Sequence, residues 1–310
     1  MAAIPQIKKK NILIIGYGSM GKKYEKILKK KFKIFFHDKK KNKKKNFLKK
    51  LNYEKIKEFY FVVISTPPKY HKFFCEICVK ANRDFIVEKP LFLKNKGWKS
   101  IIKQIDSKKL ICQVAYPRRE AISYNYIKNL IRKGRIGKLI IIKSNFSQDF
   151  RNLRKDYKNI YYSQMNEGGG IVYDALSHHI NLLTYFMGKI KKIKKTELKL
   201  SFKDIQVNDT GILTILFEKK KLGLVFGNQF QKPNIDEIEF IGTNKNLVFN
   251  RLENKLFILS NKKKLIKTFN ETYEDIFKRQ IDSFLICKRK RIQPKTTVLE
   301  EFENLSKLQV

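Results

Sequence analysis

The first third of the chain alternates short, wholly apolar segments with segments of helical periodicity, and this alternation restricts the possible folds most. The apolar segments cover residues 11–15, 32–36, 59–64, 84–87 and 110–116, and the helical ones lie near 22–31, 70–81 and 95–106. A strand that is apolar on both sides has to be covered on both faces, and strands connected through helices run parallel. The sequence therefore predicts an α/β fold built on a doubly wound parallel sheet. Residues 39–58 are rich in lysine, and we expect part of them to be helical around Phe47, Leu48 and Leu51.

After Arg119 the pattern changes. A helix is expected near 121–133, and two more near 271–287 and 296–308. The segments between them alternate apolar and polar residues, with turn signals in the connections, which is typical of a mostly antiparallel sheet. These segments are residues 139–146, 190–202, 211–217, 222–230, 235–241, 247–250 and 256–259. A chain of 310 residues can hold two cores, so we place a domain boundary at Pro117 and predict domains 1–117 and 118–310.

The chain is strongly basic, with 69 Lys and Arg residues against 28 Asp and Glu residues and a formal net charge of +41. The lysines run from end to end, together with abundant Ile, Asn, Phe and Tyr, which is typical of an AT-rich coding sequence. No zinc-finger spacing, aromatic RNA-binding motif or sustained heptad accompanies them. We therefore expect no nucleic-acid partner, although such a field would steer an anionic ligand inward.

The spacing of the cysteines argues against a metal site, and the lengths of the apolar runs argue against a signal sequence or a membrane span. Cys75-x-x-Cys78 has no second cysteine pair at metal-ligand spacing, so we favour buried packing over a zinc or redox site and expect no metal. The run 12–15 is too short for a signal sequence, and no stretch is long enough to span a membrane. We expect a cytoplasmic protein without a membrane partner.

A glycine motif, Gly16-x-Gly18-x-x-Gly21, directly follows the first expected strand and opens a helix. Glycines there allow close approach to a pyrophosphate, which the helix N-terminus favours through its N–H groups and partial positive charge. Asp38 ends the second strand about 20 residues further on, where a carboxylate accepts hydrogen bonds from a ribose. These features indicate a Rossmann dinucleotide-binding domain. Asp38 favours NAD over NADP, while Lys39 and Lys40 keep NADP open because either could pair with a 2′-phosphate.

Two further motifs end neighbouring strands. Ser65-Thr66-Pro67-Pro68 follows one strand and Glu88-Lys89-Pro90 the next. Ligands of doubly wound sheets bind at this carboxyl edge, so Lys89 could point at a nicotinamide. The alternative is one more solvated lysine. His71 follows the Pro-Pro turn, where packing at a helix start is favoured over proton transfer.

Residues 168–170 are three glycines, which form a loop that a flat ligand could approach, and a helix is expected after them. Asp174 and His178 are four residues apart and would project from one helix face. A carboxylate beside an imidazole suits acid–base chemistry. The alternative is a glycine turn followed by a surface ion pair. His179 would point about 100° away on a helix, and we interpret it as non-catalytic.

In this order and spacing, these motifs resemble those of the Gfo/Idh/MocA family of sugar and polyol dehydrogenases, over nearly the whole chain. The resemblance implies an N-terminal Rossmann domain and a C-terminal α+β domain whose open sheet often forms the interface of a dimer or tetramer. It also implies a catalytic set of Lys89, Asp174 and His178. His178 would take the alcohol proton, Asp174 would hold the imidazole and the substrate hydroxyl, and Lys89 would stabilise developing alkoxide charge.

The site residues implied in this way fall into two groups. The cofactor, NAD or NADP, is expected to contact Gly16, Gly18, Ser19, Met20, Gly21, Asp38, Ser65, Thr66, Pro67, His71, Glu88 and Lys89. The substrate, a sugar, sugar nucleotide or polyol, is expected to contact Lys89, Arg119, Arg154, Tyr157, Tyr162, Asp174, His178 and Asn181. Arg154, Tyr157 and Tyr162 belong to an insertion that resembles a branch associated with surface-glycan sugars.

The chain departs from the family pattern at two positions of the helix that carries the histidine. Leu176 stands where the family usually has glycine, and Asn181 where an aspartate is common. Both departures concern the substrate more than the chemistry. The favoured function is hydride transfer between a nicotinamide and a secondary alcohol or ketone. The alternative is a non-catalytic dinucleotide-binding sensor or regulator, which would need the glycine motif without Lys89, Asp174 and His178.

Overall fold

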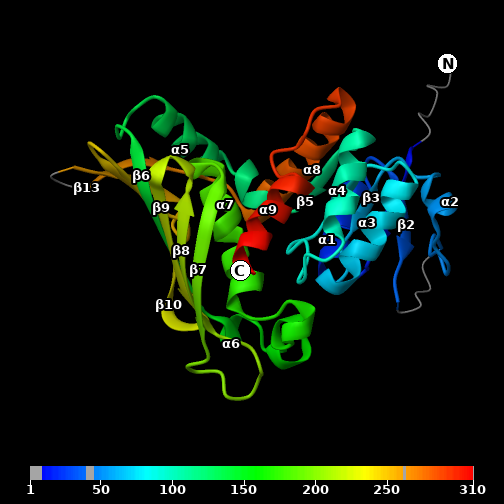
Figure 1. Ribbon diagram of the computed structural model, residues 1–310, viewed down its shortest axis with the longest axis horizontal. Coiled ribbons are helices and arrows are strands. Elements are labelled where there is room, and N and C mark those ends of the chain that lie inside the picture. Colours follow the sequence, from blue (N-terminus) through cyan, green and yellow to red (C-terminus); the bar gives the residue numbers. More distant parts are fainter. Residues whose placement is uncertain (1–8, 40–44, 261–262, 310) are drawn as a thin grey trace, which may run out of the picture. The chain divides into compact units, whose positions relative to one another are not determined.

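The computed structural model describes residues 9–39, 45–260 and 263–309, and divides them into two compact units (Figure 1). The first unit joins the residues up to Leu91 with Lys96–Ala115 and Phe284–Val298. The second unit joins Phe92–Asn95, Tyr116–Ser283 and the residues from Leu299 onward. The chain passes from the first unit to the second at Tyr116, next to the expected boundary at Pro117. The first unit also includes Phe284–Val298, a segment that we expected in the second domain.

The first unit contains a five-stranded parallel sheet in the order β2-β1-β3-β4-β5, which confirms the predicted fold class. The strands are β1 (Asn11–Ile15), β2 (Lys33–His37), β3 (Val62–Ile64), β4 (Phe85–Val87) and β5 (Cys112–Val114). The helices are α1 (Ser19–Leu28), α2 (Tyr53–Ile56), α3 (His71–Lys80) and α4 (Trp98–Ser107), with a short 3-10 turn, η1 (Pro68–Tyr70), before α3. All residues of β3 and β4 are fully buried, as expected for strands covered on both faces.

The expected helix around Phe47, Leu48 and Leu51 is wrong. Phe47 forms a parallel bridge with Phe36 of β2, and the Leu48 N–H donates to the Phe36 carbonyl at 2.8 Å. β2 is an edge strand, so its outer backbone groups accept this partner, and pairing there satisfies more hydrogen bonds than one isolated turn would. The helix starts later, at α2, where the Asn52 side chain caps it by accepting from the Lys55 N–H at 2.9 Å.

The segment Phe284–Val298 belongs to the first unit because of specific polar contacts. Val114 of β5 donates its N–H to the Thr296 carbonyl at 3.0 Å, and the Thr296 hydroxyl donates to the Val114 carbonyl at 2.7 Å. This covers the open edge of β5. The buried carboxylate of Asp84 contacts Lys288 at 2.6 Å and Arg291 at 3.0 Å. Helix α8 (Tyr273–Lys290) therefore ends within the first unit.

The second unit is built on an eight-stranded sheet in the order β13-β12-β11-β10-β6-β9-β8-β7. Only the β6–β9 pair is parallel among its neighbouring strands in the described chain, which confirms a mostly antiparallel sheet. The strands are β6 (Leu139–Asp149), β7 (Ile190–Leu198), β8 (Thr210–Phe217), β9 (Lys221–Asn228), β10 (Phe230–Gly242), β11 (Asn246–Asn250), β12 (Lys255–Leu259) and β13 (Lys263–Thr268). The sequence interpretation missed β13, whose lysines hide the alternation.

Helix α7 (Ser177–Met187) packs on one face of this sheet (Figure 1). Glycines in the strands leave space for the leucine side chains that pack on this face. A Cβ on Gly223 of β9 would lie 2.7 Å from Leu183 Cδ2, and a Cβ on Gly211 or Gly227 would lie 2.9 Å from a methyl carbon of Leu176. The remaining helices of this unit are α5 (Ile122–Arg132), α6 (Phe150–Leu153) and α9 (Val298–Leu308).

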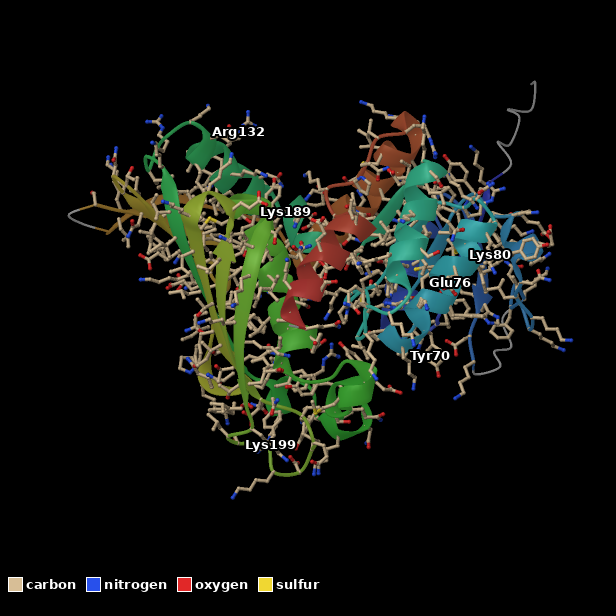
Figure 2. The ribbon with its side chains drawn as sticks, viewed as in Figure 1. Tyr70, Glu76, Lys80, Arg132, Lys189 and Lys199 are labelled. Carbon is tan, nitrogen blue, oxygen red and sulfur yellow. The ribbon has the colours of Figure 1, made fainter. Side chains whose placement is uncertain are left out.

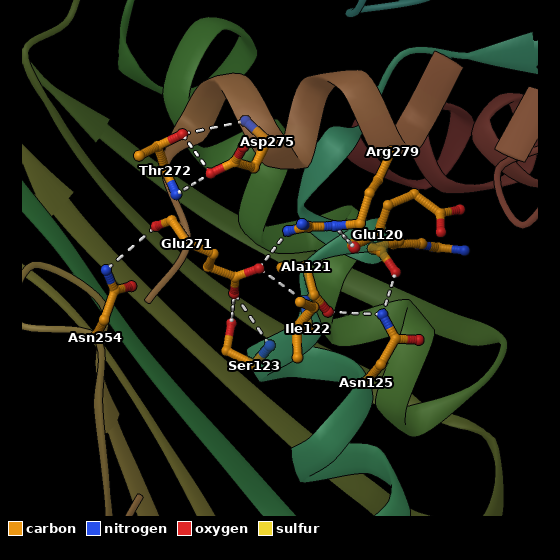
Figure 3. A network of polar contacts seen from close by, with 11 residues as sticks. Glu120, Ala121, Ile122, Ser123, Asn125, Asn254, Glu271, Thr272, Asp275 and Arg279 are labelled. Carbon is orange, nitrogen blue, oxygen red and sulfur yellow. Dashed lines mark hydrogen bonds and ion pairs between the residues drawn. The ribbon is translucent and has the colours of Figure 1, made fainter. Parts of the chain in front are cut away.

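A buried carboxylate caps helix α5. No side chain of its own N-cap residue does so, and Glu271 instead accepts the N–H groups of Ile122 at 2.8 Å and Ser123 at 3.0 Å (Figure 3). The Ser123 hydroxyl and the Arg279 guanidinium also bind Glu271. The first turn of α5 is thereby tied to the start of α8 within the second unit.

Lysines project from helices and strands of both units (Figure 2), and the labelled Lys80, Lys189 and Lys199 are exposed. All four cysteines are free and buried. Within the described ranges, no group of three or more His, Cys, Asp and Glu side chains is placed to hold a metal ion. Among the helices that the structure describes, none has the length and apolar character needed to cross a membrane.

Candidate functional site

In the first unit, each glycine of the motif after β1 has its own role. Gly16 has φ +89°, and a Cβ there would lie 2.6 Å from the Ser65 carbonyl oxygen. A Cβ on Gly21 would lie 2.2 Å from the Gly16 carbonyl oxygen. A Cβ on Gly18 would meet no described atom within 4 Å. Gly16 and Gly21 therefore allow a tight turn and close packing, while Gly18 leaves open space where a phosphate can approach the backbone.

The start of α1 suits an anion. Gly18 is the N-cap residue, no side chain caps the helix, and its first turn carries no acidic residue. The first N–H groups of the helix therefore lack side-chain acceptors among the described residues, and they carry the positive end of the helix dipole. Asp38 lies beside this loop, because its Oδ2 accepts the N–H of Tyr17 at 2.6 Å. Ser19 is exposed and Met20 is half-buried in the same turn.

The turn after β3 is held against this loop. The Ser65 hydroxyl donates to the Gly16 carbonyl at 2.7 Å. The Thr66 hydroxyl oxygen is buried and has no hydrogen-bond partner among the residues that the structure describes. A buried hydroxyl without a partner is costly, and a bound polar ligand would remove that cost. Together, the glycine loop, Asp38 and Thr66 fit a dinucleotide.

His71 connects two of the strand-end turns. Its Nε2 lies 2.8 Å from the Thr66 carbonyl oxygen, and its Nδ1 lies 3.1 Å from the Pro90 carbonyl oxygen. The ring is fully buried, and this burial lowers the His71 pKa to about 4. The neutral imidazole has one N–H and so donates to one of these two carbonyls. Its burial at the start of α3 agrees with the packing that we expected there, and a direct cofactor contact of His71 stays a prediction.

The turn after β4 carries Glu88 and Lys89. Glu88 is buried, its carboxylate accepts the Tyr24 hydroxyl at 2.9 Å, and burial raises its pKa. Lys89 is half-buried. Because β1, β3 and β4 are parallel neighbours, the loop after each of them lies at the same edge of the sheet. The structure thus brings the expected cofactor residues together within the first unit.

In the second unit, the three glycines contact the chain's own backbone. Gly169 donates its N–H to the Gln164 carbonyl at 2.9 Å, and Gly170 donates to the Tyr162 carbonyl at 3.1 Å. A Cβ on Gly169 would lie 2.0 Å from the Tyr162 carbonyl oxygen. The preceding turn therefore occupies the side of Gly169 on which a Cβ would lie, and approach of a flat ligand to this loop stays a prediction.

Asp174 and His178 lie on one continuous helical segment. Residues Val172–Leu176 form a π-helical turn that leads directly into α7, in place of the plain helix that we expected. A π turn rotates less per residue than an α turn, so positions four apart stay on one face. Both side chains are half-buried. The Tyr161 hydroxyl donates to Asp174 Oδ1, and the Tyr116 ring packs edge-on against the His178 ring with centroids 5.4 Å apart. Lys89 belongs to the first unit, and its action together with these two residues stays a prediction.

A buried acid that sequence reasoning missed binds Tyr116, whose ring packs against His178. Glu301 of α9 accepts the Tyr116 hydroxyl at 2.5 Å and the Asn181 side-chain amide at 3.3 Å. Burial raises the Glu301 pKa to about 8. One signal was available, because Glu301 lies on the same helical stripe as Val298, Leu305 and Leu308, all of which are buried. A carboxylate on an apolar stripe indicates a buried polar contact.

His179 has a different environment from His178. It is fully buried, its Nδ1 lies 2.6 Å from the Ser144 hydroxyl, and its Nε2 lies 3.1 Å from the Arg118 guanidinium. Burial, followed by the charge of Arg118, lowers its pKa to about 3. Arg118 in turn pairs with the buried Asp236 at 3.0 Å. These contacts support our interpretation of His179 as non-catalytic.

Most of the expected substrate residues also have structural partners. Arg119 is 3% exposed and contacts Glu300 at 2.8 Å and the Asn181 carbonyl at 2.6 Å. The Tyr157 hydroxyl donates to Asp204, and Tyr162 is fully buried. Arg154 is exposed. The insertion shares a small core with the connection between β7 and β8, formed by Phe150, Tyr157, Tyr162, Phe202, Ile205 and Val207. Contacts of Arg119, Arg154, Tyr157, Tyr162 and Asn181 with a substrate stay predictions.

Comparison with known families gives two matches that together span most of the chain. Residues 10–116 match a domain described as "Oxidoreductase family, NAD-binding Rossmann fold". Residues 124–248 match one described as "GFO/IDH/MocA C-terminal domain".

Curated relatives and solved structures agree with these matches. Oxidoreductase P35 of Formosa agariphila is 28% identical over 141 residues, which are 44% of this chain and 44% of that protein, so the match spans less than half of that relative. The scyllo-inositol 2-dehydrogenase (NAD(+)) of Bacillus subtilis is 24% identical over 256 residues, 79% of this chain and 72% of that protein. A levoglucosan dehydrogenase in complex with NADH and levoglucosan has a TM-score of 0.82 at 16% identity, covering 96% of this chain and 95% of that chain. At that identity the likeness concerns the fold.

Proposed function

The chain belongs to the GFO/IDH/MocA family of oxidoreductases with an NAD-binding Rossmann domain, and from this premise we propose that it transfers hydride between NAD and a secondary alcohol or ketone. The proposed substrate is a sugar, a sugar nucleotide or a polyol. The observation that carries the proposal is the helical segment of the second unit that presents Asp174 and His178 on one face. A sensor that only binds a dinucleotide would have no need of this pair.

Each residue of the proposed catalytic set has a separate task. His178 accepts the alcohol proton during oxidation, since an imidazole changes charge near neutral pH. Asp174 orients the imidazole and the substrate hydroxyl. Lys89 donates to the substrate oxygen and stabilises the negative charge that develops there. NAD, when bound, supplies the hydride acceptor. In reduction the same groups return the proton.

The residues after β2 favour NAD. The Asp38 carboxylate is held beside the glycine loop by the Tyr17 N–H, where it would accept ribose hydroxyls and repel a 2′-phosphate. Lys39 is exposed and could pair with that phosphate in NADP. Lys40 lies outside the described residues.

We further propose that the protein acts as a homo-oligomer, a dimer or tetramer, in the cytoplasm. Ile212 and Leu216 of β8 and Phe226 of β9 are 38–44% exposed on the sheet. Gly211 faces Val172 and Leu176 of the π turn, so the alternation of a strand turns Ile212 and Leu216 to the opposite face. An apolar row on an open sheet supports contact with a second copy.

The direct test is hydride transfer by the purified protein, followed at 340 nm with NAD⁺ and, separately, NADP⁺. The alcohols offered are scyllo-inositol, myo-inositol, levoglucosan and UDP-N-acetylglucosamine, which sample the polyol, sugar and sugar-nucleotide classes. We expect NAD-dependent turnover with at least one of them. Dinucleotide binding without turnover across these and a wider set of sugars would support the sensor instead.

His178→Ala separates binding from chemistry. We expect the variant to bind NADH as the wild type does, with kcat reduced at least ~100-fold, because general acid–base groups contribute on the order of 10²–10⁴. Fluorescence titration with NADH gives the first quantity and the 340 nm assay the second. Near wild-type turnover in His178→Ala would remove His178 from the mechanism.

A further inference from the structure

Tyr161 contacts the proposed catalytic carboxylate from a separate part of the second unit. It opens a short 3-10 turn, η4 (Tyr161–Ser163), 13 residues before Asp174. Its hydroxyl donates to Asp174 Oδ1, and its side chain is 36% exposed. Neither composition nor motif spacing indicates this contact.

The position of Tyr161 is fixed by its neighbours. The next residue, Tyr162, is fully buried and its ring packs on Phe150 with centroids 4.2 Å apart. Its carbonyl accepts the Gly170 N–H at 3.1 Å, and its oxygen lies where a Cβ on Gly169 would collide with it. The turn is therefore held on one side by an aromatic contact and on the other by the start of the helical segment that carries Asp174.

A hydroxyl bound to a carboxylate restricts its rotation, and O–H···O⁻ bonds are among the stronger ones in proteins. Catalysis depends on such orientation, because a group held in its reactive geometry does not have to be ordered during the reaction. Gly169 has a role in this arrangement. Because it has no Cβ, the backbone of the Tyr161–Ser163 turn can approach closely beside the segment that carries Asp174.

We propose that Tyr161 is a positioning residue that orients Asp174 for hydride transfer, and that Gly169 serves to seat its turn. This proposal rests on the proposed function. It assigns Tyr161 no contact with the reacting atoms.

The test is Tyr161→Phe, which keeps the ring and removes the hydroxyl. With a substrate identified by the 340 nm assay, we expect kcat to fall ~10-fold. Such a fall means that the hydroxyl stabilises the transition state of hydride transfer more than it stabilises the bound substrate. We expect KM for that substrate and the Kd for NADH to stay within ~2-fold. A role confined to folding would not produce this split between kcat and KM.

Two comparisons make the test specific. Tyr185→Phe removes a hydroxyl of α7, the helix that carries His178, which donates to the Asn125 side chain at 2.9 Å, and we expect its kcat to change less than ~2-fold. In an Asp174→Asn background, Tyr161→Phe should also change kcat less than ~2-fold, because the two residues act as one unit. An equal fall in both backgrounds, or the same fall in Tyr185→Phe, would overturn the proposal.

A structural readout separates this proposal from the proposed function. A hydroxyl proton held by a carboxylate should give a low-field proton resonance in the wild-type protein that is lost in both Tyr161→Phe and Asp174→Asn. If no alcohol is oxidised but this resonance is present, the proposed function fails and the positioning role fails with it, while the contact stands. If turnover is found and the resonance is absent, Tyr161 does not position Asp174 and the proposed function survives.

Discussion

Residues around His178 explain how this chain tolerates its departures from the family pattern. Leu176 is fully buried and fits because Gly211 and Gly227 leave room for its methyl groups. Asn181 donates its amide to Glu301, which a carboxylate at that position could not do. The resemblance to the family marked Leu176 and Asn181 as unusual, but their partners lie far along the chain. The apolar stripe of α9 indicates that Glu301 is buried, yet motif spacing reaches only local neighbours and does not identify its partners Tyr116 and Asn181.

The buried acid should make stability depend on pH. Because burial raises the Glu301 pKa from 4.5 to about 8, its contribution is fully present below pH 4.5 and is lost progressively as pH rises to about 8. Gln cannot ionise, so the wild type alone loses this contribution as the pH rises. We expect the free energy of unfolding of Glu301→Gln, relative to that of the wild type, to increase by a few kcal/mol from pH 5 to pH 8, at about 1.4 kcal/mol per pKa unit. Urea unfolding at both pH values measures this.

The control for this prediction is Glu303→Gln, on the same helix, whose side chain is 40% exposed. It should follow the wild-type pH dependence. If Glu301→Gln also follows it, Glu301 does not ionise within this range in the folded protein.

At the scale of elements, the apolar alternation located nearly all the strands and helices, and the errors have identifiable causes. The segment around Phe47 and Leu48 is apolar enough for a helix, but the free edge of β2 provides hydrogen bonds that no local pattern reveals. β13 is masked by its lysines. The π turn at Val172–Leu176 has no sequence signal that we used.

Helix α5 shows how a distant residue can set an element's start, and this can be tested. Glu271 accepts the Ile122 and Ser123 N–H groups, so Glu271→Ala leaves them without that acceptor. We expect the free energy of unfolding to fall by about 2 kcal/mol, typical of a lost cap with buried donors. Urea unfolding followed by circular dichroism gives the value. The exposed Glu218→Ala should change it by less than about 0.5 kcal/mol; an equal loss in both would show that Glu271 is no cap.

For the whole molecule, the sequence predicted both fold classes because each sheet has its own hydrophobic period. It could not predict that Phe284–Val298 joins the first unit. That assignment depends on contacts with Asp84 and with the edge of β5. Both lie far along the chain from residue 290, so the local sequence there does not predict the contacts. The change in hydrophobic pattern after Arg119 indicates where the chain passes out of the first unit. It does not indicate that a later segment packs against that unit again.

The assembly prediction belongs to this scale. If the exposed row on β8 joins two copies, Ile212→Lys with Leu216→Lys should give a particle of 36.9 kDa, while the wild type has two or four times that mass. Light scattering coupled to size-exclusion chromatography measures both. Leu252→Lys, at an exposed turn outside this row, should keep the wild-type mass. A wild type that is already monomeric would exclude the interface.

The return of the chain to the first unit has a consequence during synthesis. A ribosome makes the chain from its N-terminus, and domains generally fold in that order. Here the five-stranded sheet acquires the strand-edge partner Thr296 and the cations around Asp84 only after the chain has been made as far as residue 296. The NAD-binding unit, although begun first, is thus completed only after the whole eight-stranded sheet has been translated.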